Sequence, residues 1–180
     1  SVTGYRPTVP SWSGEARSRS RELSKALLDL IGHTVNTLRR QNDPRVVLRD
    51  AYGLGEGVSN TIARHLEEHT LDSFQVPDPN RLIVEQIVSG GMPTYLITSC
   101  RGRGFNTALG YFMAGLAEQD GIAVLELSFD ENGLLIKTSQ EVDPRRMYDS
   151  FQSNDHIEVI ERYIVSTQIF AKRFREVAGR

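Results

Sequence analysis

Residues 122–139 read IAVLELSFDENGLLIKTS, and this stretch decides the fold class. Two runs rich in aliphatic residues, 122–129 and 134–139, flank the segment Asp130-Glu131-Asn132-Gly133. An Asn-Gly pair between two such runs is a strong hairpin signal. We therefore predict a β-hairpin here. The sequence predicts two hairpins, and the signal for this one is the stronger.

The other predicted hairpin lies upstream. Residues 82–88 and 95–99 are rich in Ile, Val, Leu and Tyr, and Gly90-Gly91 separates them. Between the two hairpins, apolar residues recur at helical spacing. They are Phe105, Ala108, Leu109, Phe112, Met113 and Leu116. The order hairpin, helix, hairpin follows.

Both ends of the chain are predicted to be helical. Ser20 is a good N-cap, and Leu23, Ala26, Leu27, Leu30, Ile31, Val35 and Leu38 then follow a helical period. Asp43-Pro44 starts a second helix, glycines at 53, 55 and 57 interrupt the pattern, and a third helix runs from about Ser59 to Thr70. After Asp143-Pro144, two or three helices are expected.

These elements predict an α+β fold with a mainly antiparallel sheet, built from two hairpins and flanked by helices at both ends. We expect a single domain over residues 1–180. It comprises an extended arm (1–19), a helical part (20–75), a sheet with an embedded helix (81–139) and a helical end (143–180).

Composition excludes several classes of protein. No apolar run approaches the roughly 20 residues that cross a bilayer, and the N-terminus lacks a signal-peptide pattern, so we expect a cytoplasmic protein without membrane contact. The single cysteine, Cys100, cannot form an internal disulfide. The formal net charge of −2 means that any nucleic-acid contact must come from local clusters of cations.

Four strings, in order, resemble the DEAD/H-associated region of Lhr-type (large helicase-related) ATP-dependent helicases, and together they span nearly the whole chain. The first is Val9-Pro10-Ser11-Trp12-Ser13-Gly14-Glu15 followed by Ser20, Glu22 and Leu23, which is similar to the family's P-x-W-x-G-E string and the helix start after it. The second is Val76-Pro77 with Arg81, Ile83, Val84 and Glu85, which resembles the strand that opens the family's sheet.

The third string runs from Ser99 through Asn106, with Ala108 and Leu109. The family usually has Pro-Phe-Gly-Arg before its asparagine, whereas this chain has Cys100-Arg101-Gly102-Arg103, so the glycine and arginine match and the aromatic is lost. The fourth string, residues 169–180, is similar to the family's F-x-x-R-F-R-x-x-A-x-R helix.

The resemblance implies a segment cut from a larger helicase that moves along single-stranded DNA, with 3′ to 5′ as the expected direction. Two RecA-like motor domains and a winged helix are expected upstream in the same chain, and ATP and Mg²⁺ are expected there. RNA or a DNA–RNA hybrid stays open as an alternative strand. The segment itself has no G-x-x-x-x-G-K-[ST] loop and no Asp-Glu box, so we assign no catalytic residue and no cofactor to it.

Trp12 is the first candidate site residue. It lies in a Pro- and Gly-rich arm, where an indole can stack on an unpaired base, and the resemblance favours that role over a plug that pins the arm to the core. Four arginines surround it and are candidates for phosphate binding, with a solvated charged surface as the alternative. They are Arg6, Arg17, Arg19 and Arg21.

A second group of candidates lies between a predicted strand and a predicted helix. Arg101 and Arg103, with backbone amides and Asn106, could bind an anion near the helix N-terminus. The alternative is a tight turn that needs glycine, with Asn106 capping the helix. For Cys100, a buried position at a strand end is favoured over a reactive thiol.

Two further hypotheses compete with nucleic-acid binding. A structural module that braces the motor domains, with arginines facing protein carboxylates, explains the near-zero net charge equally well. A zinc hydrolase would rest on His65, Glu68 and His69, which match an H-x-x-E-H pattern on a short, charged helix. The family shows no histidine pair there, so we assign no metal ligand.

Overall fold

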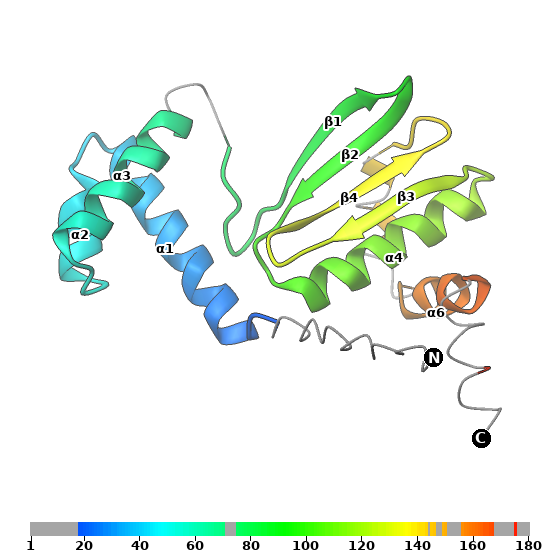
Figure 1. Cartoon of the computed structure of the whole chain (residues 1–180), viewed down its shortest axis with the longest axis horizontal. Coiled ribbons are helices and arrows are strands. Elements are labelled where there is room, and N and C mark those ends of the chain that lie inside the picture. Colours follow the sequence, from blue (N-terminus) through cyan, green and yellow to red (C-terminus); the bar gives the residue numbers. More distant parts are fainter. Residues whose placement is uncertain are drawn as a thin grey trace, which may run out of the picture.

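The computed structural model describes residues 18–70, 75–143, 145–146, 149–150, 156–167 and 175. Figure 1 shows a group of three helices followed by a sheet with further helices. The helices are α1 (Arg21–Arg39), α2 (Pro44–Asp50), α3 (Glu56–Thr70), α4 (Arg103–Gln119) and α6 (His156–Ser166). The strands are β1 (Ile83–Ser89), β2 (Met92–Thr98), β3 (Val124–Phe129) and β4 (Gly133–Thr138).

The sheet joins two hairpins edge to edge. Its order is β1-β2-β4-β3, and every neighbouring pair is antiparallel. Tyr95 on β2 lies opposite Ile136 on β4, which in turn lies opposite Leu127 on β3. The predicted α+β fold with two hairpins is therefore confirmed, and α4 is the connection between them.

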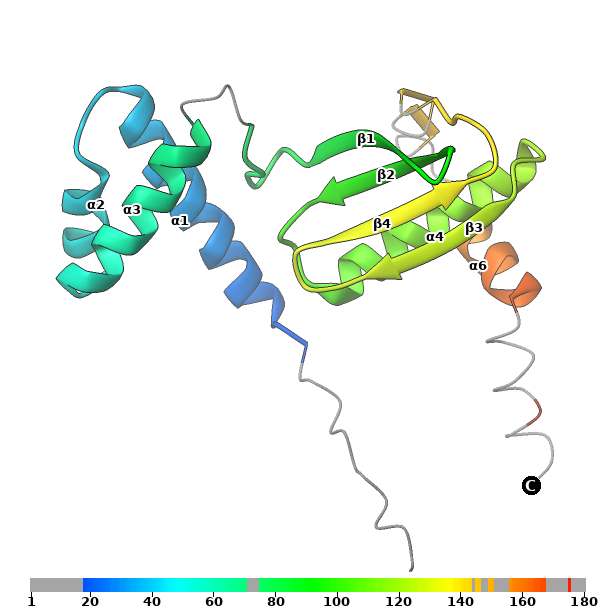
Figure 2. The ribbon, with the colours of Figure 1, turned by 45° about the horizontal axis from the view of Figure 1, so that its top comes forward.

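One face of the sheet holds the core. Alternate residues of β2 and β4 point to this face and are buried, among them Tyr95, Ile97 and Ile136. They pack against the α4 residues Met113 and Ala114, and Figure 2 shows α4 behind the sheet. The opposite face stays open, with Ile87 and Leu96 exposed by 51% and 39%.

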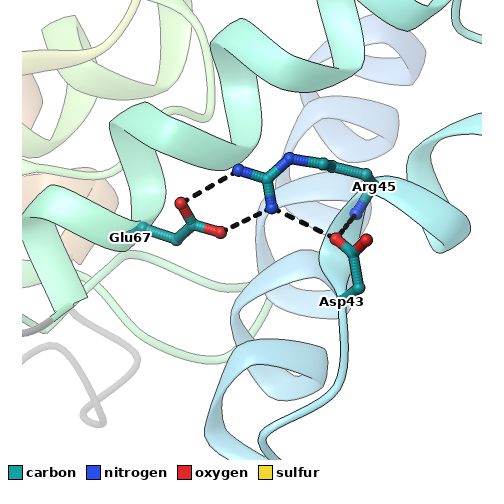
Figure 3. Close-up of polar contacts among 3 residues, drawn as sticks. All are labelled: Asp43, Arg45 and Glu67. Carbon is teal, nitrogen blue, oxygen red and sulfur yellow. Dashed lines mark hydrogen bonds and ion pairs between the residues drawn. The ribbon is translucent and has the colours of Figure 1, made fainter.

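The three N-terminal helices have their own small core and an ion-pair network. Leu48 and Ala63 are fully buried between the helices. Arg45, at the start of α2, binds Glu67 of α3 through two bonds of 2.8 and 3.1 Å and also contacts Asp43 at 3.2 Å (Figure 3). Two-pronged binding of this kind fixes geometry as well as charge, so α2 is held in place on α3.

The two hairpin turns are built differently. Gly90 and Gly91 have φ of 61° and 77°, so they form the two-residue turn with two positive φ values that the β1–β2 hairpin needs. Gly133 has no positive φ. In that turn the Asp130 carboxylate accepts from the amides of Asn132 (2.7 Å) and Gly133 (2.9 Å). The Asn-Gly pair therefore predicted the position of the hairpin correctly, although the turn is not the type with two positive φ values.

Several predicted boundaries shift. The helix expected from Ser59 begins at Glu56, because Gly57 lies inside its first turn and does not interrupt it. The strand expected from Tyr95 begins at Met92, directly after the Gly-Gly turn. The strand expected from Ile122 begins at Val124, since the amides of Gly121, with a φ of 74°, and Ile122 still donate to the last carbonyls of α4. The fourth string of the resemblance lies outside the described residues except for Arg175.

The N-caps at Ser20 and Asp43 are confirmed. Ser20 Oγ accepts from the amide of Leu23 at 3.1 Å, and Asp43 Oδ1 accepts from the amide of Arg45 at 2.9 Å. Across the part of the chain that the structure describes, no helix is both long and apolar enough to span a bilayer.

The contact between α4 and α6 generates a stability prediction. A β-carbon at Gly115 would lie 2.8 Å from Val159 Cγ1 and 3.1 Å from Val159 O. We expect Gly115→Ala to lower the free energy of unfolding by about 1–3 kcal/mol, because α6 must move away. Urea denaturation measures this. Gly57→Ala is the matched control, since nothing lies within 4 Å of that position, and unchanged stability in Gly115→Ala would contradict the packing.

Candidate nucleic-acid interface

Three segments meet beside the first turn of α4. They are residues 18–20 before α1, the loop 99–102 after β2, and the turn 130–132 between β3 and β4. The carbonyl of Asn132 accepts from the amides of Ser99 (2.9 Å) and Cys100 (2.7 Å), and the carbonyl of Glu131 accepts from Gly102 at 3.1 Å. This backbone network fixes the loop that carries Arg101 and leads into α4 at Arg103.

The carboxylate of Glu131 lies at the centre of this junction. Its Oε2 accepts from the backbone amide of Arg103 at 3.1 Å and from that of Arg19 at 3.2 Å. The first amides of a helix lack partners within the helix and attract negative charge. Glu131 therefore occupies the predicted anion position at the start of α4, and this amide is already satisfied inside the protein.

Gly102 shows why the turn is tight. Its φ is 92°, and a β-carbon there would lie 3.0 Å from Ser24 Oγ on α1. Glycine is the residue that adopts this backbone conformation without strain. The alternative interpretation of Arg101-Gly102-Arg103-Gly104, a strand-to-helix turn that needs glycine, fits the geometry, and the turn lies close to Ser24 of α1.

Asn106 is fully buried and supports the same junction. Its Oδ1 accepts a short bond from Ser99 Oγ, and its Nδ2 donates to the carbonyl of Asp130 at 2.9 Å. The N-cap of α4 is Gly102, so the expectation that Asn106 caps this helix is wrong. Its amide ties the loop after β2 to the β3–β4 turn, which makes it a positioning residue here, while contact with nucleic acid stays a prediction.

The four described candidate arginines differ in their surroundings. Arg19 Nη2 donates to Asn132 Oδ1 at 3.0 Å, while its Nη1 is buried without a hydrogen-bond partner. Arg101 Nη2 donates to Pro79 O at 2.5 Å, and its guanidinium lies 5.1 Å from the centre of the Phe105 ring. Arg21 and Arg103 are exposed, and within the described ranges their side chains form no hydrogen bond or ion pair.

The backbones of these arginines converge at one junction. The backbone amides of Arg19 and Arg103 bind the same carboxylate oxygen, and Arg21 and Arg101 each lie two residues away along the chain. We call these four residues the arginine cluster. The remaining candidates, Trp12, Arg6 and Arg17, lie outside the described residues.

Cys100 faces inward. Its side chain is 8% exposed, and burial raises the pKa of its thiol, although Arg19 acts in the opposite direction. A raised pKa leaves little thiolate at neutral pH. The favoured interpretation, a buried small residue after a strand, is confirmed.

The zinc hypothesis for α3 stays untested, because one histidine of its pair lies outside the described side chains. No group of three or more His, Cys, Asp or Glu residues in this part of the structure could hold a metal ion, and the side chain of His69 is not among those described. The neighbouring Glu67 binds Arg45.

Sequence reasoning missed Glu131 as the residue that completes this junction. It is separated from Arg103 by 28 positions, and only the pairing of β2 with β4 brings the two together. The usable signal was its place next to an Asn-Gly hairpin turn, at the same edge of the sheet as the loop after β2.

Comparison with known proteins agrees with the four strings. Residues 76–180 match the family model described as DEAD/H associated. The chain is 26% identical over 184 residues to ATP-dependent helicase Lhr-Core protein 2 of Thermococcus barophilus, and 22% identical over 187 residues to ATP-dependent helicase Lhr-Core of Saccharolobus solfataricus. Each alignment covers 98% of this chain but only 20% and 21% of the relative.

The chain thus spans about a fifth of the length of the curated relatives that it matches. A solved structure of the Mycobacterium smegmatis helicase Lhr, bound to ssDNA and AMP-PNP, has the same fold over 97% of this chain and 22% of that chain. The TM-score is 0.65 and the identity is 19%. The resemblance to Lhr-type helicases inferred from the four strings is confirmed.

The burial of Asn106 gives a second prediction. Asn106→Ala removes the acceptor of the Ser99 hydroxyl and the donor to the carbonyl of Asp130, so we expect the free energy of unfolding to fall by about 1–3 kcal/mol. Chemical denaturation measures the change. Asn60→Ala on the exposed surface of α3 is the control, and equal effects of the two variants would argue against this role.

Proposed function

This chain belongs to the DEAD/H associated family, and we propose that it is an accessory nucleic-acid-binding segment of an Lhr-type ATP-dependent helicase. In this proposal the segment contacts the single strand along which the motor moves, and it does no chemistry. ATP, with Mg²⁺, binds and is hydrolysed in RecA-like domains elsewhere in the full protein, and a winged helix lies between them and this segment.

The arginine cluster is the observation that carries the proposal. Phosphate contacts come mainly from arginine and lysine, and they position a protein on a strand without reading its sequence. Arg21 and Arg103 are exposed and form no ion pair within the described residues, so their charges are available to phosphates. Because Glu131 already satisfies the α4 amide, the exposed guanidinium groups of Arg21 and Arg103 are the part of this junction that a phosphate can reach.

Trp12 supplies the second half of the proposed contact. The backbone of Arg19 is fixed at Glu131, and Trp12 lies seven positions earlier in the chain, which is a reach of at most about 25 Å. An indole within that distance of the arginine cluster can stack on a base while the arginines bind the neighbouring phosphates. Arg6 and Arg17 belong to the same proposed surface.

A bracing module is the alternative that one observation favours. The open face of the sheet exposes Ile87 and Leu96, which another domain of the full protein could cover. Under this alternative the arginine cluster pairs with carboxylates of the motor domains, and the strand is held elsewhere.

Removal of two charges tests the phosphate contacts. We expect the double variant Arg21→Gln, Arg103→Gln to bind a labelled single-stranded oligonucleotide more weakly and with a smaller salt dependence. The slope of log affinity against log salt should shrink by roughly 0.7 for each arginine, because each phosphate contact releases counterions. Fluorescence anisotropy over a salt series measures both. Arg64→Gln on α3 removes a charge far along the chain, and a slope that the double variant shares with it would rule out these contacts.

Trp12→Ala tests stacking separately from charge. Loss of one stacked base should weaken binding on the order of tenfold and leave the salt slope unchanged, since no charge is removed. The same anisotropy series reports both quantities. If neither the unaltered chain nor Trp12→Ala binds single-stranded DNA, the bracing function takes precedence.

A further inference from the structure

A cavity of about 480 Å³ lies between α1, Tyr52 and the segment 76–81 that leads into β1. Figure 1 shows this segment running between the helical part and the sheet. The volume falls in the range of small-molecule sites, which is about 300–1,000 Å³. The cavity is separate from the junction that carries the arginine cluster.

Two rings form one wall of the cavity. The rings of His33 and Tyr52 meet edge to face, with centroids 6.0 Å apart at an angle of 66°, and Tyr52 Oη lies 3.4 Å from His33 Nδ1. The apolar residues Leu28 and Val35, which are 4% and 1% exposed, also line the cavity. A flat aromatic ligand gains most from such a surface, because ring stacking adds to apolar burial.

Two amides of the lining are available for hydrogen bonds. The side chains of Asn36 and Asn80 are exposed at the cavity and make no hydrogen bond within the described ranges. Each amide offers two donors and one acceptor group. Nucleobase edges present the same mixture of donors and acceptors in one plane, so the amides suit a base better than they suit a purely apolar ring.

The charged residues that line the cavity favour a neutral group in its interior. Asp29 is paired with Lys25 at 3.1 Å, and Asp78 with Arg81 at 3.8 Å, so the carboxylates of the lining are offset. Arg39 is exposed and forms no ion pair in the described part of the chain. A neutral ring inside and a phosphate beside Arg39 satisfy this distribution, whereas an isolated phosphate in the interior would lie near two carboxylates.

The cavity and the arginine cluster are connected by structure. Pro79 lines the cavity, and its carbonyl accepts from Arg101 of the cluster. Helix α1 carries Arg21 of the cluster near its start and Arg39 of the cavity at its end. The two residues are 18 positions apart, or about 27 Å along the helix axis. A few nucleotides of an extended strand can cover that distance.

We propose that this cavity binds one nucleobase together with its adjoining phosphate, a site that deepens the proposed function and rests on it. The base stacks on Tyr52 and His33, the amides of Asn36 and Asn80 bond to its edge, and Arg39 binds the phosphate. The same chemistry is offered by an unpaired base of a single strand and by a free nucleotide, and the strand is the favoured source because the arginine cluster can hold its continuation.

Gly32 provides a direct test. A β-carbon there would contact Asp78 Cβ at an ordinary 3.9 Å, so Gly32→Ala fits, whereas the longer side chain of Gly32→Leu enters the cavity. Both substitutions favour the helix. The probe is a single-stranded oligonucleotide that carries 2-aminopurine, whose fluorescence is quenched by stacking. We expect Gly32→Leu to bind 5- to 50-fold more weakly than Gly32→Ala, with less quenching and an unchanged salt slope.

Tyr52→Leu and Tyr52→Phe form a second pair, which serves if Gly32→Leu fails to fold. Loss of the ring should weaken binding, and loss of the hydroxyl alone should have a smaller effect. If Gly32→Leu binds like Gly32→Ala, or Tyr52→Leu like Tyr52→Phe, while the unaltered chain binds with strong salt dependence, the cavity proposal is overturned and the proposed function stands.

If the unaltered chain binds no oligonucleotide at any salt concentration, the proposed function is overturned. Binding of adenosine 5′-monophosphate and cytidine 5′-monophosphate then tests whether the cavity is a nucleotide site. Shifts of the Asn36 side-chain amide and the Tyr52 ring protons in an NMR titration, absent in Gly32→Leu, would support a free nucleotide as the ligand. No shift with either nucleotide would overturn the site.

Discussion

Gly133 passes so close to β2 that a β-carbon at this position would collide with the carbonyl oxygen of Ile97. Only glycine allows this approach, and the pairing of β2 with β4 depends on it. That pairing joins two hairpins, each marginal alone, into one sheet with a single buried face. It also places the β3–β4 turn beside the loop after β2, so the functional candidates inherit their geometry from the sheet.

At the junction beside the start of α4, the backbone amides and the arginine side chains have different partners. Glu131 satisfies the amides of Arg19 and Arg103, and Asn106 closes the opposite side by binding Ser99 and Asp130. An internal carboxylate therefore does at the start of α4 what a bound phosphate does in many nucleotide-binding proteins. The guanidinium groups of Arg21 and Arg103 stay exposed, which suits contacts along a strand better than capture of one tightly enclosed anion.

The parts of the fold that depend on local sequence patterns could be predicted. The parts that depend on contacts between distant residues could not. Both hairpins, the N-caps at Ser20 and Asp43 and the stripe of α4 depend on residues within a few positions of one another. Glu131 and the cavity do not, because the partners of Glu131 are 28 and 112 positions away and the cavity forms only where α1 meets residues 76–81. The role of Gly133 was concealed for the same reason: its neighbour Ile97 belongs to another hairpin.

The net charge of −2 constrains how such a segment can hold a nucleic acid. Without a broad positive field, attraction is confined to within about a Debye length of the arginine cluster, roughly 8 Å at physiological salt. A strand would then be guided to this surface by the rest of a helicase and gripped locally, through a few phosphates and stacked rings. Weak binding of that kind, independent of base sequence, is what a segment needs if the strand must slide past it at every step of the motor.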